Sequence, residues 1–320
     1  PEWGDIVVDY VNEIDDELEI EQISDEEAYP FITWVGEEVD EAYYKAVMGI
    51  EINPGLDKSD FKIVYSPQHG ADNIPVRTCL KRLGYDIVPV LAQCAPDPDY
   101  TNTKSPNPEV DSSYELAIKL AKEVDADVVA ITDPDGDRLG VVAKHNGEYV
   151  LMSGNQSAAV YLEYILSQRK EKGTLPDNAV MYNTIVTSDL GELVARSYGV
   201  DVEKTLTGFK FIGDKIRKYE KTHEKQFIFG YEESYGCVVE DFVRDKDAVQ
   251  AVLLAAECGN YYKKQGKDLI DVLNELYAKH GTFKESQIAL AKAGAAGAAR
   301  IKEIMDNLRK DAPKEIGGVK

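Results

Sequence analysis

The sequence predicts an α/β fold made of two consecutive α/β/α-layered domains with mixed, mostly parallel sheets. Short apolar runs rich in β-branched residues alternate with stretches of helical period over most of the 320 residues. This alternation is typical of parallel strands joined by right-handed helical crossovers. It begins again after residue 154, which indicates a second domain. An Asn146-Gly147 pair between two apolar runs predicts an antiparallel hairpin, so we expect the first sheet to be mixed.

The first domain is predicted to span residues 37–154, and it begins with a helix at 37–50. The predicted elements that follow are strands 61–65, 86–90 and 127–131, helices 73–83 and 114–124, and hairpin strands 139–144 and 149–152. Gly84 suits the C′ position after the first crossover helix. Asp111 or Ser112 is expected to cap the second crossover helix.

The second domain is predicted to span residues 155–285. Its predicted strands are 179–183, 200–206 and 226–229, and its predicted helices are 155–167, 189–198, 207–219, 247–265 and 269–279. Residues 1–36 carry apolar positions at helical spacing, followed by an acidic linker. A strand-like run beyond Gly281 and an Ala-rich helix at 291–309 lead to the interpretation of residues 286–320 as a connector to a further domain.

The two ends of the chain suggest a fragment. The chain begins at Pro1, without a Met, and ends in Gly-Gly-Val-Lys, which resembles the start of an interrupted strand. All residues before Lys45 lack a basic side chain, and many are acidic, so the opening segment is expected to be a solvated helix or a peripheral tail. We therefore expect this chain to be part of a longer protein.

The net charge excludes some classes of partner. Lys and Arg number 36 and Asp and Glu 58, which gives −22 at pH 7. That balance argues against binding to nucleic acid or to an anionic membrane. The 4 cysteines have no CxxC spacing, so we expect reduced thiols in a cytoplasmic protein. Within these residues we see no signal-peptide pattern and no apolar run of membrane-spanning length. Nothing in the sequence indicates a particular oligomeric state.

A loop with three carboxylates follows the predicted strand 127–131. Asp133, Asp135 and Asp137 alternate with Pro134 and Gly136, which end the strand and make the loop turn. Carboxylates this close repel one another unless a cation or a basic partner is present. Hard oxygen ligands suit Mg²⁺, Ca²⁺ or Mn²⁺, and loops at strand ends are where open α/β sheets bind ligands. A metal loop is therefore favoured over a solvated acidic turn.

Other polar groups follow predicted strands or lie beside the carboxylate loop. His69 could donate to a phosphate or carry a proton, or it could be a structural turn residue. Arg138 could neutralise the aspartates or bind a phosphate that shares the metal. The remaining candidates are Thr207, Gly208 and Lys210 for an anion at a helix start, Glu232 and Ser234 for vicinal hydroxyls, and Arg244 and Lys246 for phosphate charge.

These loops resemble those of the α-D-phosphohexomutases, the phosphoglucomutase/phosphomannomutase family. The resemblance rests on Asp-Pro-Asp-Gly-Asp-Arg at 133–138, Thr-Gly-Phe-Lys at 207–210 and Gly-Tyr-Glu-Glu-Ser-Tyr-Gly at 230–236, in the family's order. Ser-Pro-Gln-His-Gly at 66–70 is similar to a Thr-Pro-x-His-Gly turn of the family. The similarity covers about residues 36 to 285, which correspond to the second and third of the family's four domains. It implies that residues 1–36 are the tail of the first domain with a linker, and that residues 286–320 lead to the fourth.

The resemblance implies a function and a set of site residues. It implies that Asp133, Asp135 and Asp137 bind Mg²⁺, that Arg138 contacts substrate or phosphate, and that residues 207–210 orient the sugar phosphate. Glu232 and Ser234 would hold the hydroxyls of a phosphosugar. The implied reaction is phosphoglucomutase-like: glucose 1-phosphate is converted to glucose 6-phosphate through a phosphoserine and a bisphosphorylated intermediate. Phosphopentomutase or phosphomannomutase specificity is the alternative within the family.

The sequence departs from the family pattern in three places. Neither the Ser-His-Asn-Pro type phosphoserine signature nor the Arg-x-Ser-Gly-Thr phosphate loop of the fourth domain occurs in the 320 residues. We therefore expect this chain alone to be inactive, with no catalytic serine of its own. Tyr231 also stands where Gly is common in the family.

Functions from other classes remain as alternatives. A haloacid-dehalogenase-type phosphatase also uses Asp-x-Asp-Gly after a strand, and would make Asp133 a nucleophile; such enzymes usually have Thr or Val where Asp137 stands. A calcium-binding EF-hand counted from Asp133 needs Gly at position six and Glu at position twelve, but Arg138 and Lys144 occupy them. A non-catalytic fragment that binds sugar phosphate or metal is the third alternative.

Overall fold

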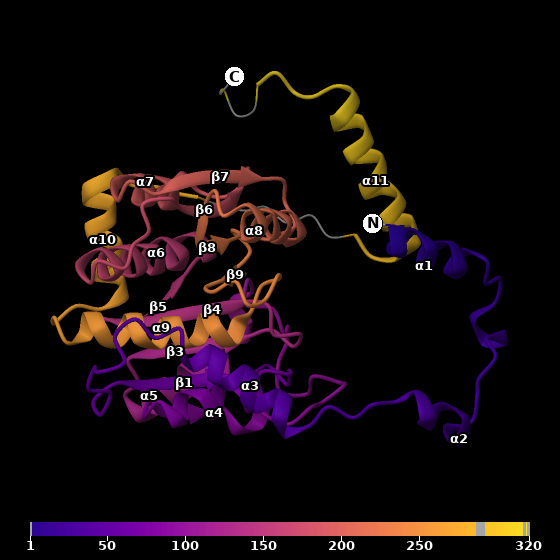
Figure 1. Cartoon of the computed structure of the whole chain (residues 1–320), viewed down its shortest axis with the longest axis horizontal. Coiled ribbons are helices and arrows are strands. Elements are labelled where there is room, and N and C mark those ends of the chain that lie inside the picture. Colours follow the sequence, from indigo (N-terminus) through magenta and orange to yellow (C-terminus); the bar gives the residue numbers. More distant parts are fainter. Residues whose placement is uncertain (1, 286–291, 316–317, 319–320) are drawn as a thin grey trace.

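Two α/β/α units with mixed sheets make up the body of the protein (Figure 1). The computed structural model describes residues 2–285, 292–315 and 318. The strands of the first sheet are β1 (Lys62–Ser66), β2 (Asp86–Pro89), β3 (Val128–Thr132), β4 (Leu139–His145) and β5 (Glu148–Met152). They lie in the order β2-β1-β3-β4-β5, with β1, β2 and β3 parallel and the β4–β5 hairpin antiparallel. This topology confirms the predicted mixed sheet.

The second sheet has the order β7-β6-β8-β9. Its strands are β6 (Ala179–Thr184), β7 (Asp201–Thr205), β8 (Gln226–Tyr231) and β9 (Cys237–Val238). The first three are parallel, whereas β9 pairs antiparallel with β8. The sequence did not predict β9, because two residues carry no detectable strand period.

Helices cover both faces of each sheet. They are α3 (Glu37–Met48), α4 (Asn73–Arg82), α5 (Glu115–Val124), α6 (Gly154–Glu171), α7 (Asp189–Ser197), α8 (Phe209–Thr222), α9 (Ala248–Lys263) and α10 (Leu269–His280). Helix α5 packs on one face of the first sheet through Ala117 and Ala121, and α8 packs on one face of the second through Ile212 and Ile216. A single large apolar core fills the space between the two sheets.

Helix α9 belongs to this shared core although it follows the second sheet in sequence. It contacts α3, α4, β3 and β4 of the first unit, and also α6 and α10. Gly259 of α9 lies so close to Phe61 that a Cβ at Gly259 would be 2.7 Å from the Phe61 ring. The two units are therefore joined by packing as well as by the chain. The domain boundaries stay a prediction.

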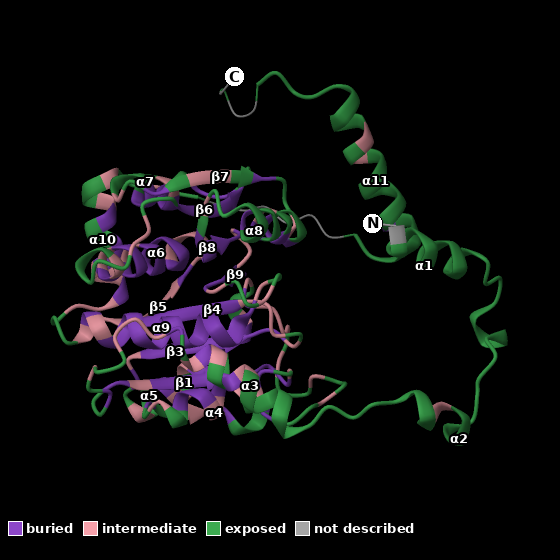
Figure 2. Cartoon of the chain, viewed as in Figure 1, coloured by how far each residue is buried: buried purple, intermediate pink, exposed green. Residues whose placement is uncertain are grey.

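The segments outside this body are exposed. Helices α1 (Glu2–Asn12) and α2 (Asp25–Ala28) lie on an extended arm away from the two sheets, and α11 (Gly294–Lys310) also lies apart from them (Figures 1 and 2). Large apolar side chains on this arm, such as Trp3 and Trp34, are exposed. None of the helices in the described part of the chain has the length and apolar character needed to cross a membrane.

Several local predictions can be compared with the structure. The hairpin turn is confirmed, with positive φ at both Asn146 and Gly147. The predicted cap of α5 is wrong, because Asp111 and Ser112 form a 3₁₀ turn and α5 begins without a side-chain cap. The strand-like run beyond Gly281 falls mainly on residues 286–291, outside the described residues, and residues 282–285 form no strand.

Glu203 on β7 provides a test of pH-dependent stability. Burial alone would raise the pKa of Glu203, but hydrogen bonds from Lys215, Lys225 and Tyr219 outweigh it and lower the pKa to about 2. A carboxyl whose pKa falls on folding stabilises the protein above its unfolded pKa of about 4.3. This contribution is lost as the pH falls toward 2.

We predict that Glu203→Gln lowers the free energy of unfolding by about 1 kcal/mol at pH 7, because these side chains are only partly buried. The difference from the unchanged protein should shrink toward zero between about pH 4.5 and pH 2. Urea unfolding at several pH values measures both effects, with the exposed Glu224→Gln as control. A destabilisation that persists unchanged at pH 2.5 would contradict the assignment.

Candidate active site

The loop between β3 and β4 brings three carboxylates together. Oxygen atoms of Asp133, Asp135 and Asp137 lie within 4.8 Å of one another. Asp133 is buried, Asp137 is half-buried and Asp135 is exposed. The Asp133 Oδ1 atom accepts hydrogen bonds from the backbone N–H groups of Asp137 at 3.1 Å and Arg138 at 3.0 Å. These bonds curl the loop so that the carboxylates face one point.

Two cationic side chains lie against this loop. Arg138 Nε is 2.9 Å from Asp133 Oδ2, and Arg138 Nη1 donates to Glu109 at 3.1 Å. Lys246 Nζ, which reaches the loop from the second unit, is 2.6 Å from Asp137 Oδ2. Arg138 thus neutralises its neighbours in this structure, and its contact with a phosphate stays a prediction.

The environment shifts the pKa values of two loop carboxyls in opposite directions. Burial and the neighbouring carboxylates raise the pKa of Asp133 above its usual range, although the backbone N–H of Arg138 opposes this. Burial alone would also raise the pKa of Asp137, but the hydrogen bond and charge of Lys246 lower it. Asp133 Oδ2 and Asp137 Oδ1 are both buried, and Arg138 Nε lies 2.9 Å from the first and 3.4 Å from the second without the geometry of a hydrogen bond. The ligand set consists of hard carboxylate oxygens, which fits a cation such as Mg²⁺.

Two further buried acids, Asp72 and Asp247, lie near this loop. Asp72 precedes α4 and is 6% exposed. Burial, and then the charges of Asp247 and the three loop aspartates, raise the pKa of Asp72 to about 7. Asp247 accepts hydrogen bonds from Tyr43 Oη at 2.9 and 3.0 Å and caps α9 through the backbone N–H of Gln250. Asp72 was not predicted from the sequence, because nothing in its local pattern distinguishes it from an ordinary helix cap.

The turn at residues 66–70 packs directly on the aspartate loop. A Cβ at Gly70 would lie 2.4 Å from the Cα of Pro134, and the Ala71 N–H donates to the Pro134 carbonyl at 2.9 Å. His69 is nevertheless turned into the protein, where its Nδ1 is 2.7 Å from the Ala95 carbonyl oxygen and its ring meets Tyr100 edge-on. This arrangement favours the structural role that the sequence left open for His69.

The loop after β8 is joined to the start of α8. Glu232 Oε1 accepts the Gly208 N–H at 2.8 Å. Gly208 has a φ of 117°, which other residues rarely adopt, and it precedes the first residue of α8. The carboxylate thus lies at the positive end of that helix. Glu232 is therefore hydrogen-bonded to the predicted anion-binding turn at 207–210.

The next residues of this loop point to other neighbours. Glu233 Oε2 accepts hydrogen bonds from Thr184 at 3.0 Å and Thr187 at 3.3 Å, which fix the loop after β6. Ser234 lines a groove of about 1010 Å³ that also includes Glu233 and Thr187. The side chain of Tyr231 points into the core, where its Oη fills the space that a Cβ at Gly191 would need. The Tyr that departs from the family pattern is thus a packing residue.

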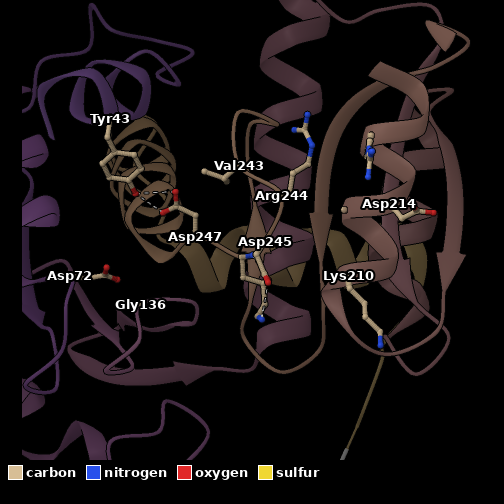
Figure 3. A pocket seen from close by; sticks show the side chains of 12 residues that line it. Tyr43, Asp72, Gly136, Lys210, Asp214, Val243, Arg244, Asp245 and Asp247 are labelled. Carbon is tan, nitrogen blue, oxygen red and sulfur yellow. Dashed lines mark hydrogen bonds and ion pairs between the residues drawn. The ribbon is translucent and has the colours of Figure 1, made fainter. Parts of the chain in front are cut away.

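A cleft of about 710 Å³ lies where the two units meet (Figure 3). Lys210, Arg217, Arg244 and Lys246 line it together with Asp72 and Gly136. Arg244 also pairs with Glu220 at 2.7 Å. Asp214, Asp245 and Asp247 line it as well, and Lys246 Nζ is 3.3 Å from Asp245 Oδ1. The cleft therefore combines the turn of the aspartate loop with four cationic side chains, which suit a phosphate group, and with carboxylates that offset part of their charge. Arg217 was not predicted, because its position on α8 becomes informative only once the helix is placed.

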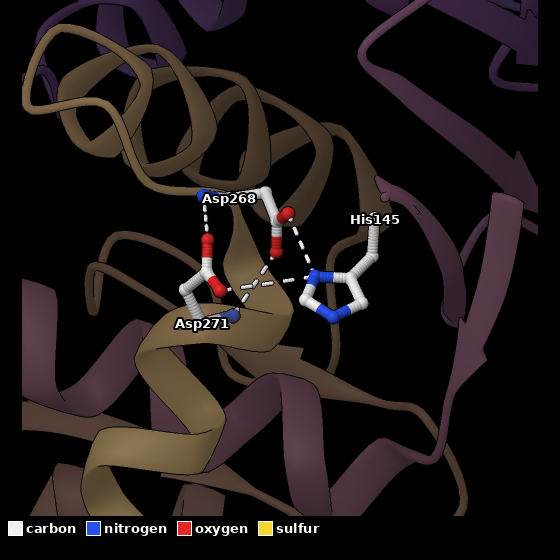
Figure 4. A group of neighbouring side chains, drawn as sticks. All are labelled: His145, Asp268 and Asp271. Carbon is white, nitrogen blue, oxygen red and sulfur yellow. Dashed lines mark hydrogen bonds and ion pairs between the residues drawn. The ribbon is translucent and has the colours of Figure 1, made fainter. Parts of the chain in front are cut away.

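A second group of potential ligands lies at the opposite end of β4 (Figure 4). His145 Nδ1 is 2.8 Å from Asp268 Oδ2 and 3.8 Å from Asp271 Oδ1. The other oxygen of each carboxylate belongs to the capping box of α10, since Asp268 Oδ1 accepts the Asp271 N–H and Asp271 Oδ2 accepts the Asp268 N–H. We assign this group a structural role: it ties the β4–β5 hairpin to α10.

Comparison with known proteins identifies two domain matches. Residues 41–147 match alpha/beta/alpha domain II of phosphoglucomutase/phosphomannomutase, and residues 153–280 match domain III. The phosphoglucomutase of Staphylococcus haemolyticus is 33% identical over 318 residues, which are 98% of this chain and 56% of the relative. That of Staphylococcus epidermidis is 36% identical over 288 residues, 89% of this chain and 51% of the relative. The chain thus spans about half the length of these relatives.

Solved structures share the fold at lower identity. A putative phosphomannomutase from Thermus thermophilus superposes with a TM-score of 0.61 at 22% identity, over 75% of this chain and 50% of that one. An N-acetylphosphoglucosamine mutase from Aspergillus fumigatus, solved with GlcNAc-6P and magnesium, has a TM-score of 0.53 at 16% identity, over 75% of this chain and 50% of that one.

Gly136 allows a test of the loop geometry. It has a φ of 75°, and a Cβ there would lie 2.4 Å from Asp72 Oδ1. Gly147 has a φ of 83°, but a Cβ at Gly147 would have no neighbouring atom within 4 Å. Gly147 is therefore a matched control, with the same backbone strain and no steric conflict.

We predict that Gly147→Ala costs about 1–2 kcal/mol from the backbone alone, and that Gly136→Ala costs roughly 1–3 kcal/mol more because the methyl group displaces Asp72. Chemical denaturation of both variants measures the difference. Equal losses in the two variants would show that Asp72 does not press on the loop.

Proposed function

Because this chain belongs to the phosphoglucomutase/phosphomannomutase family, we propose that it forms the two central domains of a Mg²⁺-dependent phosphosugar mutase. The observation that carries the proposal is the position of the aspartate loop. Its three carboxylates converge within 4.8 Å, and the turn that carries them lines a cleft with Lys210, Arg244 and Lys246. A cation site beside a cluster of cationic side chains is the arrangement that phosphoryl transfer requires.

In this proposal Asp133, Asp135 and Asp137 hold the metal ion. When bound, Mg²⁺ would offset the negative charge that develops on a transferring phosphoryl group. The backbone N–H groups of residues 137 and 138 hold the Oδ1 atom of the Asp133 carboxylate in place. Lys246 holds Asp137 in place and keeps an ammonium group at the edge of the cleft.

The second unit is proposed to bind the sugar phosphate. Lys210, Arg244 and Lys246 supply positive charge for a phosphate, and Thr207 and Gly208 form the turn at the start of α8. Glu232 and Ser234 lie on one loop after β8 and are proposed to orient the sugar hydroxyls. The hydrogen bond from the Gly208 N–H to Glu232 links the turn at the start of α8 to the loop after β8, and so limits their relative movement.

The proposed reaction is the interconversion of glucose 1-phosphate and glucose 6-phosphate through a phosphoserine and a bisphosphorylated intermediate. The names of the staphylococcal relatives support glucose phosphates, and pentose or mannose phosphates are the alternatives. The 320 residues contain neither the Ser-His-Asn-Pro signature nor Arg-x-Ser-Gly-Thr, so we propose that this chain alone is inactive. We also propose a cytoplasmic enzyme, which the four buried, free cysteines support.

The geometry disfavours two alternatives from other classes. A phosphatase nucleophile must be accessible, whereas Asp133 is 2% exposed and one of its oxygens already accepts two backbone N–H groups. An EF-hand places its loop between two helices, whereas this loop joins β3 to β4.

We predict that the natural full-length enzyme isomerises glucose 1-phosphate and that Asp135→Asn lowers its kcat about 10²–10³-fold, because one of three metal-binding charges is lost. A coupled assay with glucose 1-phosphate, ribose 1-phosphate and mannose 1-phosphate measures activity and preference. Asp177→Asn, an exposed carboxylate before β6, should change kcat less than twofold. Full activity of Asp135→Asn with Mg²⁺ would rule out the ligand assignment.

We predict that the 320-residue chain alone gives no mutase turnover with Mg²⁺ and glucose 1-phosphate, since it contains no phosphoserine signature. The same coupled assay at high protein concentration tests this expectation, and calorimetric titration with glucose 1-phosphate shows whether the chain still binds the substrate. Turnover proportional to chain concentration would refute the prediction that the chain is inactive. Binding without turnover would identify it as a sugar-phosphate-binding piece.

A further inference from the structure

We propose that Asp72 is a fourth acidic member of the metal centre, outside the three converging aspartates, which strengthens cation binding by accepting hydrogen bonds from water on the metal ion. The inference rests on the proposed metal site at Asp133, Asp135 and Asp137. It adds a residue from a different loop, the one that follows β1.

The Asp72 side chain faces the aspartate loop. Asp72 precedes α4 with a helical backbone (φ −75°, ψ −5°), and its side chain accepts no backbone N–H of the first helical turn. The carboxylate turns toward the aspartate loop, as Figure 3 shows beside Gly136. Its oxygens are therefore not engaged in capping α4.

The Asp72 carboxylate is also buried without a partner. Asp72 is 6% exposed, and its Oδ2 atom has no hydrogen-bond donor among the described residues. None of the ion pairs in the described part of the chain involves Asp72, and the two cations on the loop pair with Asp133 and Asp137. An unpaired buried carboxylate is costly, and a divalent cation nearby would remove that cost.

Asp72 is held at a fixed distance from the metal loop. Gly136 lies between Asp135 and Asp137, and a Cβ there would lie 2.4 Å from Asp72 Oδ1. The hydrogen bond from Ala71 to the Pro134 carbonyl, at 2.9 Å, anchors the Asp72 backbone to the same loop. The carboxylate is therefore positioned before any cation arrives.

The distances between oxygen atoms explain why we do not propose Asp72 as a direct metal ligand. The three oxygen atoms that lie within 4.8 Å of one another come from Asp133, Asp135 and Asp137, and no Asp72 oxygen belongs to that set. Mg²⁺ keeps several water molecules when proteins bind it, and residues that hydrogen-bond to the metal's own ligands contribute about 10–100-fold to affinity. Asp72 also lines the cleft of about 710 Å³, which leaves room for such water.

The test is a titration of the chain with Mn²⁺, followed by calorimetry and by the electron paramagnetic resonance signal of free Mn²⁺. Asp72→Asn, which keeps the shape of the side chain, should raise the Kd about 10–100-fold. Asp177→Asn loses one exposed charge elsewhere and should change the Kd less than twofold. The metal-induced rise in Tm should shrink in Asp72→Asn, whose Tm without metal should not fall.

The outcomes separate this inference from the metal site itself. A Kd for Asp72→Asn within twofold of the unchanged chain, while Asp135→Asn loses binding, would overturn the role of Asp72 and leave the aspartate site intact. An equal rise in Kd for Asp72→Asn and Asp177→Asn would show that only the net charge of the chain matters. That result would also overturn the role of Asp72. Undiminished binding in Asp135→Asn, or no binding by the unchanged chain, would overturn the metal site and this inference together.

Discussion

The concentration of negative charge in the loop between β3 and β4 is the constraint on which the rest of this structure depends. Carboxylates this close must be offset by cations, and the chain supplies one from each side: Arg138 from the loop itself and Lys246 from the second unit. Near the ion pair of Lys246 with Asp137, two backbone hydrogen bonds also join the units. The Ala248 N–H donates to the Gly136 carbonyl, and the Leu139 N–H donates to the Tyr235 carbonyl. The contacts of this loop therefore join the two units in addition to the packing of α9.

The same junction brings cationic side chains to the aspartate loop. The loop belongs to the first unit, whereas the cationic side chains of the cleft come from α8 and from the segment just before α9, together with Asp214 and Asp245. Because Lys246 immediately precedes the Asp247 cap of α9, its position is set by a helix that packs under the first sheet. The position of a phosphate bound by Lys246, relative to the aspartate loop, would thus be fixed by the buried packing of α9 as well as by surface charge.

The sequence was sufficient for the features that depend on local pattern. Period and turn residues predicted the strands of both sheets apart from β9, the Asn146-Gly147 hairpin and the convergence of Asp133, Asp135 and Asp137, because neighbours in sequence determine all of these. The sequence was insufficient to predict features that depend on contacts between residues far apart in the chain. Asp72 resembles an ordinary helix cap until the loop with Gly136 is placed beside it, and α9 resembles any helix of the second domain until its packing on β3 and β4 is seen. The burial of His69 likewise depends on Ala95 and Tyr100, which lie in another loop.

The position of α9 has a consequence for how this protein can be divided. A piece that ended after β5 would contain every strand of the first sheet, yet it would leave the faces of β3 and β4 and the groove beside α4 without their covering helix. Such a piece would expose a broad apolar surface and would tend to self-associate. The order of the elements along the chain differs from their order in space, so a self-contained first unit would need α9 fused directly to it.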